Sequence, residues 1–178
     1  ENISLALTAA KSTTTDTLYE VKATYLTDNI GDVSVGPNNS LALTLKDSGS
    51  VATSLFDGSK GVNLFTSNFT DWRIVWPTAN TISLTTKATS GVSGYSYNLS
   101  TSNGSLTKTA GPLDALTSLL SPDGRNLAYS YISGGKTIFA FKNLVDKSGY
   151  EILPTTIADK CVWDKTNTGV LYCGTPSA

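Results

Sequence analysis

Four acidic residues are the side chains best placed for chemistry, because one precedes the first strand of each repeat that the sequence predicts. They are Asp32, Asp71, Asp114 and Asp159. Carboxylates that converge at the mouth of a channel could hold a hard cation such as Ca²⁺ through oxygen ligands. Asp also caps backbone N–H groups in turns, and we favour this role because the distance from each Asp to the next turn varies. We therefore assign no metal site and keep Ca²⁺ as the alternative.

Trp72 and Arg73 form a second candidate group, at a predicted junction between a loop and a strand. An indole ring that carries one polar atom suits the binding of a sugar or a peptide. The guanidinium of Arg73 could stack on the ring of Trp72 or pair with the carboxylate of Asp71. Together with the four acidic residues, Trp72 and Arg73 make up the candidate ligand-facing set.

The sequence lacks the residues of several common enzyme mechanisms. It has no His, which excludes Ser-His-Asp and Cys-His catalysis and zinc sites that need imidazole. It also has no Gly-x-Ser-x-Gly nucleophile elbow. Gly135-Lys136-Thr137 resembles the end of a phosphate-binding loop, but Ser130 stands where the first Gly of that motif belongs. We expect no catalytic residue, no cofactor and no enzyme activity in this chain.

The two cysteines, Cys161 and Cys173, both lie in the last repeat. If this segment is a hairpin centred on Asn167, the two residues lie directly opposite each other. Opposed Cβ atoms in an antiparallel pair are about 4.5–5.5 Å apart, close enough for a disulfide after a modest adjustment. The alternative is a pair of buried free thiols, as is common in reducing compartments. We predict the disulfide, and with it an oxidising location outside the cytoplasm.

A turn-and-strand phrase that recurs along the chain predicts the elements that position these residues. The clearest copy is residues 119–129, in which a Ser-Pro-Asp-Gly turn joins two apolar strands. Looser copies lie at residues 35–43, 75–84 and 162–171. A period of about 40 to 45 residues is typical of the four-stranded blade of a β-propeller. The sequence therefore predicts an all-β propeller of antiparallel blades.

The repeats supply about four blades' worth of chain. Three blades are complete, at residues 32–68, 71–109 and 114–153, and partial blades lie at residues 1–28 and 159–178. In a closed ring the N-terminal piece would complete the C-terminal blade and remove the open sheet edges. In a longer protein the chain would be an arc of a larger ring. Residues 1–178 are thus one propeller domain or a propeller fragment, and the absence of an initiator Met favours the fragment.

Three strand assignments matter for the boundaries between the blades. The second blade is expected to end in a strand at residues 105–109, and the third to begin in a separate strand at residues 116–120. The third blade is expected to end in a strand at residues 150–153.

The segment Ser121 to Tyr129 resembles the SPDG-x-x-[IL]-A-[FY] signature of WD-repeat-like propellers. The stretch from Trp72 to Trp163 is more narrowly similar to uncharacterised bacterial propeller proteins that are exported or tethered to the cell envelope. The resemblance covers roughly residues 30–175 and implies the propeller fold and a place outside the cytoplasm. The Gly-His and Trp-Asp pairs of eukaryotic WD repeats are absent, so the resemblance does not imply their signalling roles.

Composition narrows the class of partner. The chain has 13 basic and 14 acidic residues, and only 15% of its residues are charged, which argues against a nucleic-acid partner. It has no apolar run long enough for a membrane helix. We expect a non-catalytic module that binds a protein partner or acts in assembly, exported and associated with the envelope. The alternatives are an accessory propeller of a larger, oligopeptidase-like hydrolase and a carbohydrate-binding propeller.

Overall fold

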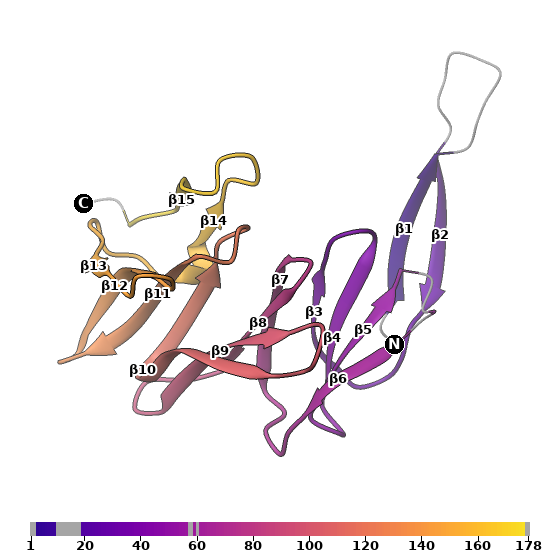
Figure 1. Cartoon of the computed structure of the whole chain (residues 1–178), viewed down its shortest axis with the longest axis horizontal. Helices are drawn as coiled ribbons and strands as arrows, with labels where there is room; N and C mark the ends of the chain where they lie inside the picture. Colours follow the sequence, from indigo (N-terminus) through magenta and orange to yellow (C-terminus); the bar gives the residue numbers. More distant parts are fainter. Residues whose placement is uncertain (1–2, 10–18, 57–58, 60, 177–178) are drawn as a thin grey trace, which may run out of the picture.

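The computed structural model describes residues 3–9, 19–56, 59 and 61–176. Antiparallel sheets follow one another in chain order, so that the first and last sheets lie at opposite ends of the row (Figure 1). Apart from strands and turns, the described residues contain only the short 3₁₀ helix η1 (Ala158–Lys160). The all-β prediction is therefore confirmed.

The first complete blade is a four-stranded sheet in the order β3-β4-β5-β6. Its strands alternate with short turns and run antiparallel throughout: β3 (Ile30–Val35), β4 (Ser40–Leu45), β5 (Ser50–Leu55) and β6 (Val62–Thr66). Before it, β1 (Ile3–Ala9) and β2 (Tyr19–Tyr25) pair as a two-stranded sheet. β1 and β2 lie within residues 1–28, and β3 begins at Ile30, two residues before the predicted start of the first complete blade.

The next two blades share one seven-stranded sheet in the order β13-β12-β11-β10-β9-β8-β7. Its strands are β7 (Trp72–Thr78), β8 (Thr81–Thr86), β9 (Ser93–Ser100), β10 (Leu106–Leu120), β11 (Asn126–Ser133), β12 (Lys136–Asn143) and β13 (Gly149–Glu151). β13 is shorter than expected and ends before Ile152.

A single long strand joins these two blades, and here the sequence prediction of two separate strands is wrong. The first part of β10 pairs with β9 as the outer strand of the second blade, and its last part pairs with β11 as the first strand of the third. The pairing register shifts between Lys108 and Ala110, between Ala110 and Leu113, and between Asp114 and Thr117. β-Bulges of this kind bend a strand without breaking it, so the chain changes partners while it stays extended.

The fourth sheet is the hairpin of β14 (Cys161–Trp163) and β15 (Leu171–Cys173). Within the described residues this hairpin and the β1-β2 hairpin are separate sheets, so the row of sheets does not close into a ring there. The described residues thus contain three sets of four strands, the second and third of which share β10, with a two-stranded hairpin before and after them.

Successive sheets pack face to face through alternating side chains. Ile82 and Leu84 of β8 are fully buried in a cluster that also contains Ala42 and Val51 of the first blade. A second cluster joins the third blade to the β14-β15 hairpin through Phe139 and other apolar residues. Because successive residues of a strand point to opposite faces, each blade can contact both of its neighbours.

The second blade is polar on its other face, which contains hydroxyl groups where an apolar core would be expected. Thr85 Oγ1 lies 2.6 Å from Ser118 Oγ of the third blade, and Ser96 Oγ lies 3.0 Å from the same oxygen. Thr109 Oγ1 donates to Ser96 Oγ at 3.0 Å. Thr85, Ser96 and Thr109 are buried, so their hydroxyls satisfy one another between the two blades.

Candidate functional site

The first strands of successive blades border a pocket of about 410 Å³. β3, β7, β10, β14 and the short helix η1 all contribute to its lining, so the pocket lies where the innermost strands of the propeller converge. Its walls contain both polar and apolar side chains, namely Asp32, Arg73, Ile74, Val75, Lys87, Ser118, Leu119, Ala158, Asp159 and Cys161. Three of the residues predicted from the sequence to face a ligand, Asp32, Arg73 and Asp159, are among them.

Arg73 and Asp159 form an ion pair across this pocket, between Nη1 and Oδ2. The two residues are 86 positions apart in the sequence. Their side chains are 43% and 33% exposed, so solvent screens the pair and leaves both groups accessible to a ligand. The pair places one positive and one negative charge at the opening, a pattern that suits a polar partner better than a purely anionic one.

Asp32 joins two blades by capping backbone groups. Its Oδ1 accepts a hydrogen bond from Val33 N at 2.9 Å, and its Oδ2 accepts one from Ile74 N at 3.0 Å. Two residues further along β3, Ser34 Oγ accepts from Trp76 N at 2.9 Å. Both side chains thus satisfy N–H groups of β7, whose other edge pairs with β8. The capping role expected for Asp is observed at Asp32, although the capped strand belongs to the neighbouring blade.

The other acidic candidates lie apart from this arrangement. Asp114 Oδ1 accepts from Ser93 Oγ at 3.0 Å, and Asp71 is exposed at the start of β7. Neither residue lines the pocket. In the part of the chain that the structure describes, no group of three or more His, Cys, Asp or Glu is placed to hold a metal ion. Of the four predicted carboxylates, those of Asp32 and Asp159 line the pocket and those of Asp71 and Asp114 lie elsewhere.

Trp72 does not face a ligand, and this prediction is corrected by the structure. Its residue surface is only 5% exposed, and its Nε1 donates to Phe69 O at 2.9 Å. Its ring packs edge-on against Phe69 and Tyr97, with ring centroids 4.9 and 6.1 Å away. The loop before β7 folds back over the strand, so the indole fills the core between two blades.

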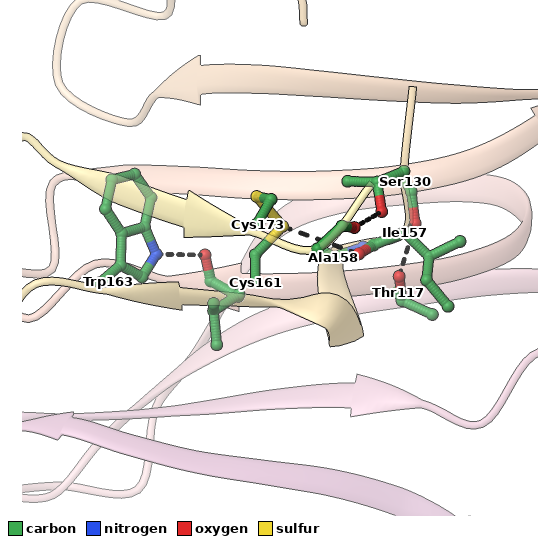
Figure 2. The surroundings of a disulfide bond; sticks show 10 residues. Thr117, Ser130, Ile157, Ala158, Cys161, Trp163 and Cys173 are labelled. Atoms are coloured by element: carbon green, nitrogen blue, oxygen red, sulfur yellow. Dashed lines mark hydrogen bonds between the residues drawn. A yellow bond between two sulfur atoms is a disulfide. The ribbon is translucent and has the colours of Figure 1, made fainter. Parts of the chain in front are cut away.

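Cys161, which lines the pocket, forms a disulfide with Cys173 (Figure 2). The two residues are directly opposite in the β14-β15 register, with their Cα atoms 4.1 Å apart, so the prediction from the hairpin geometry is confirmed. Ala158 N, beside the bridge, donates to Ser130 Oγ at 3.1 Å, and Trp163 Nε1 donates to Leu119 O at 3.1 Å. These bonds attach the hairpin to the third blade.

Sequence reasoning missed two polar residues of the pocket, Lys87 and Ser118. Lys87 Nζ donates to Gly31 O at 3.4 Å, which again links the second blade to the first. Ser118 belongs to the buried hydroxyl cluster and also borders the pocket. Both lie at regular strand or loop positions in a chain rich in Ser and Thr, so no local signal separates them from other polar residues.

The strand order and the sheet packing define the class of this chain: it has a β-propeller fold, in which the first strands of the blades border a common pocket. Comparison with solved structures agrees with this assignment. The chain is similar to the propeller TolB from Acinetobacter baumannii, with a TM-score of 0.56 and 17% sequence identity. The match covers 79% of this chain and 36% of TolB.

The chain is also similar to a propeller in the structure of a nidogen/laminin complex, with a TM-score of 0.53 and 10% identity. That match covers 74% of this chain and 51% of the other. The chain thus spans about a third to a half of the structures it matches. No protein-family model and no curated protein sequence matches the chain. At these identities the likeness establishes the fold alone.

Proposed function

We propose that this chain is a non-catalytic binding module that docks a protein partner over the pocket bordered by Arg73 and Asp159. One observation carries the proposal: an accessible ion pair lies at the point where strands of three sheets meet. A propeller is a rigid scaffold, so groups at its centre keep their positions when a partner arrives and lose little conformational entropy. Exposed charged groups around an apolar floor, here Leu119 and Val75, are typical of a protein interface rather than of a small-molecule site.

The same proposal places the module outside the cytoplasm, in the cell envelope or secreted. The support is the Cys161–Cys173 disulfide, because such bridges form and persist in oxidising compartments. The residues 121–129 resemble WD-repeat-like propellers, and we include that type in the proposal. No helix among the described residues is long and apolar enough to cross a membrane.

Site-specific photo-crosslinking tests the partner surface. A photoreactive residue in place of Lys87, which lines the pocket, is compared with the same residue in place of Lys46, an exposed lysine in the first blade that does not line it. In envelope extracts of the source organism we expect a discrete protein adduct from position 87 and none from position 46. Charge reversal by Arg73→Glu is expected to remove that adduct. Equal adducts from both positions, or an adduct that survives Arg73→Glu, contradicts the proposal.

A further inference from the structure

Two adjoining cavities form a groove between the second and third blades, away from the pocket at the inner strands. Their volumes are about 240 and 370 Å³, and Lys108, Thr109 and Lys142 line both. The groove follows the outer part of the cleft, along β9 and the first part of β10 on one side and the end of β12 on the other. We refer to these two cavities together as the inter-blade groove.

One wall of the inter-blade groove consists of neutral polar side chains. They come from one face of the second blade: Thr81, Asn98, Ser100, Ser105, Thr107 and Thr109. This wall continues the hydroxyl face on which Thr85 and Ser96 contact the third blade. Ser and Thr hydroxyls both donate and accept hydrogen bonds. Asn98 lies on the same wall, with its amide oxygen buried and without a hydrogen-bond partner.

The inter-blade groove also carries three lysines and no carboxylate among its lining residues. Lys142 Nζ donates to Thr109 O at 2.9 Å, which holds that ammonium across the groove, and Lys147 Nζ donates to Leu144 O. The nearby Asp146 is engaged elsewhere, since its Oδ1 accepts from Ser148 N at 2.8 Å. Within the described residues the ion pair found is Arg73–Asp159, so none of these lysines is neutralised by a carboxylate.

Three positive charges in one groove of a chain whose net charge is −1 favour an anionic ligand. The wall of neutral polar side chains, here called the hydroxyl wall, limits which class of anionic ligand fits the inter-blade groove. Nucleobases bind single-strand sites largely by stacking on several aromatic rings, whereas Tyr129 is the one aromatic residue among the lining residues of the inter-blade groove. An extended peptide gains specificity from pockets for alternate side chains, whereas this wall offers a continuous set of hydroxyl and amide groups that suits sugar hydroxyls.

We propose that the inter-blade groove binds an acidic oligosaccharide. The ammonium groups of Lys108, Lys142 and Lys147 pair with its carboxylates, while the hydroxyl wall of the second blade bonds to its ring hydroxyls. This proposal does not depend on the proposed protein-binding site at the pocket bordered by Arg73 and Asp159, because that pocket and the inter-blade groove share no residue.

Calorimetric titration with three matched tetramers tests the ligand class. Tetragalacturonate carries both carboxylates and sugar hydroxyls, maltotetraose carries hydroxyls alone, and tetraglutamate carries carboxylates on a peptide. We expect tetragalacturonate to bind at low ionic strength and to weaken as salt is added, because salt screens exposed charges. Maltotetraose and tetraglutamate are each expected to bind at least about tenfold more weakly, a difference of about 1.4 kcal/mol.

Lysine variants test the site. Lys142→Gln and Lys108→Gln are each expected to raise the Kd for tetragalacturonate about fivefold, since each removes one charged hydrogen-bond donor. Lys46→Gln, a matched change outside the inter-blade groove, is expected to leave the Kd unchanged. Lys108 is exposed, so its variant decides the test if Lys142→Gln proves unstable.

Three results would overturn the proposal. The first is no measurable binding of tetragalacturonate. The second is tetraglutamate that binds as tightly as tetragalacturonate, which would identify the inter-blade groove as an acidic-peptide site. The third is equal weakening by Lys46→Gln and Lys108→Gln, which would mean that the whole surface attracts anions without a defined site.

Discussion

Single side chains in this protein act mainly by satisfying backbone groups. Asp123, in the Ser-Pro-Asp-Gly turn, accepts hydrogen bonds from Ser121 Oγ at 2.5 Å and from Arg125 N at 3.0 Å. Ser121, which is fully buried, in turn accepts from Asn126 N at 2.9 Å. Gly124 completes the turn at a φ of 73°, a conformation that other residues rarely adopt. The turn signature in the sequence therefore corresponds to a closed set of hydrogen bonds.

These hydrogen bonds also determine how the turn responds to pH. Partial burial raises the pKa of Asp123, but the hydrogen bonds from Ser121, Arg125 and Thr168 and the Arg125 charge outweigh that effect and hold the pKa below its ordinary value. A carboxyl group whose pKa is lower in the folded state stabilises the fold above its unfolded pKa, near 3.9. That contribution is lost as the pH falls through the lower, folded-state pKa.

We predict that Asp123→Ala lowers the free energy of unfolding by about 1 kcal/mol at pH 7, because the donors that bond to its carboxylate lose their acceptor. The loss should shrink as the pH falls below about 4, because the carboxyl group then takes up a proton in the unfolded chain while it is still ionised in the folded protein. Urea unfolding at pH 7 and pH 3 measures both values. The exposed Asp71 provides the control, since Asp71→Ala should change stability little. An Asp123→Ala effect that is equal at both pH values would contradict this role for the carboxylate.

At the level of elements, the C-terminal hairpin depends on its disulfide more than on its hydrogen bonds. β14 and β15 contain three residues each, and an isolated hairpin of this length is marginal in water. Asp164 adds a cap at the turn, where its Oδ1 accepts from Thr166 N at 2.7 Å and Asn167 N at 2.9 Å. The disulfide joins two residues that are 12 positions apart in the sequence. It also holds Cys161 in the lining of the pocket that Arg73 and Asp159 border.

We predict that Cys161→Ser lowers the Tm under non-reducing conditions only. Loop closure of this size stabilises a fold by about 3 kcal/mol in the chain-entropy model. Thermal unfolding of both proteins, each with and without reductant, measures the effect. Reductant should lower the Tm of the wild type to that of Cys161→Ser. The Tm of Cys161→Ser should be the same with and without reductant. A wild type that melts at the same temperature in both conditions would rule out a stabilising bridge.

At the level of the whole molecule, the row of sheets is held together by contacts between blades. Gly36, just after β3, lies against the ring of Trp76 on β7, where a Cβ atom would be 2.3 Å from the indole. The side chains of Asp32 and Ser34 bond to the same strand. The first two blades therefore approach so closely that one methyl group does not fit between them.

We predict that Gly36→Ala destabilises the protein by about 1–3 kcal/mol, because the methyl group forces the two blades apart. Gly61→Ala is the matched control: its added Cβ would meet Thr53 O at an ordinary 3.6 Å, so it should be neutral or slightly stabilising. Urea unfolding of both variants gives the comparison. Equal stability of the two variants would show that the Gly36–Trp76 contact does not limit how closely the blades pack.

The amino-acid sequence by itself determined the strands, the turns and the disulfide, because each depends on neighbours in the chain. The Ser121–Gly124 turn and the Cys161–Cys173 register belong to single hairpins, whose geometry follows from residue types and period-2 alternation. The same local logic failed for residues 105–120, where the sequence predicted two strands. There, bulges let one strand change partners, and the cost of a bulge depends on the sheets on either side.

Only the tertiary structure decided which of the candidate residues meet. Arg73 and Asp159 pair across 86 residues, Asp32 caps a strand of another blade, and Trp72 turns inward. The lysines of the inter-blade groove likewise come from β10, β12 and the turn that follows β12. These contacts depend on the angle and distance between packed sheets, which arise from side-chain packing over the whole interface. No short stretch of sequence carries that information, so the sites are determined only when the blades assemble.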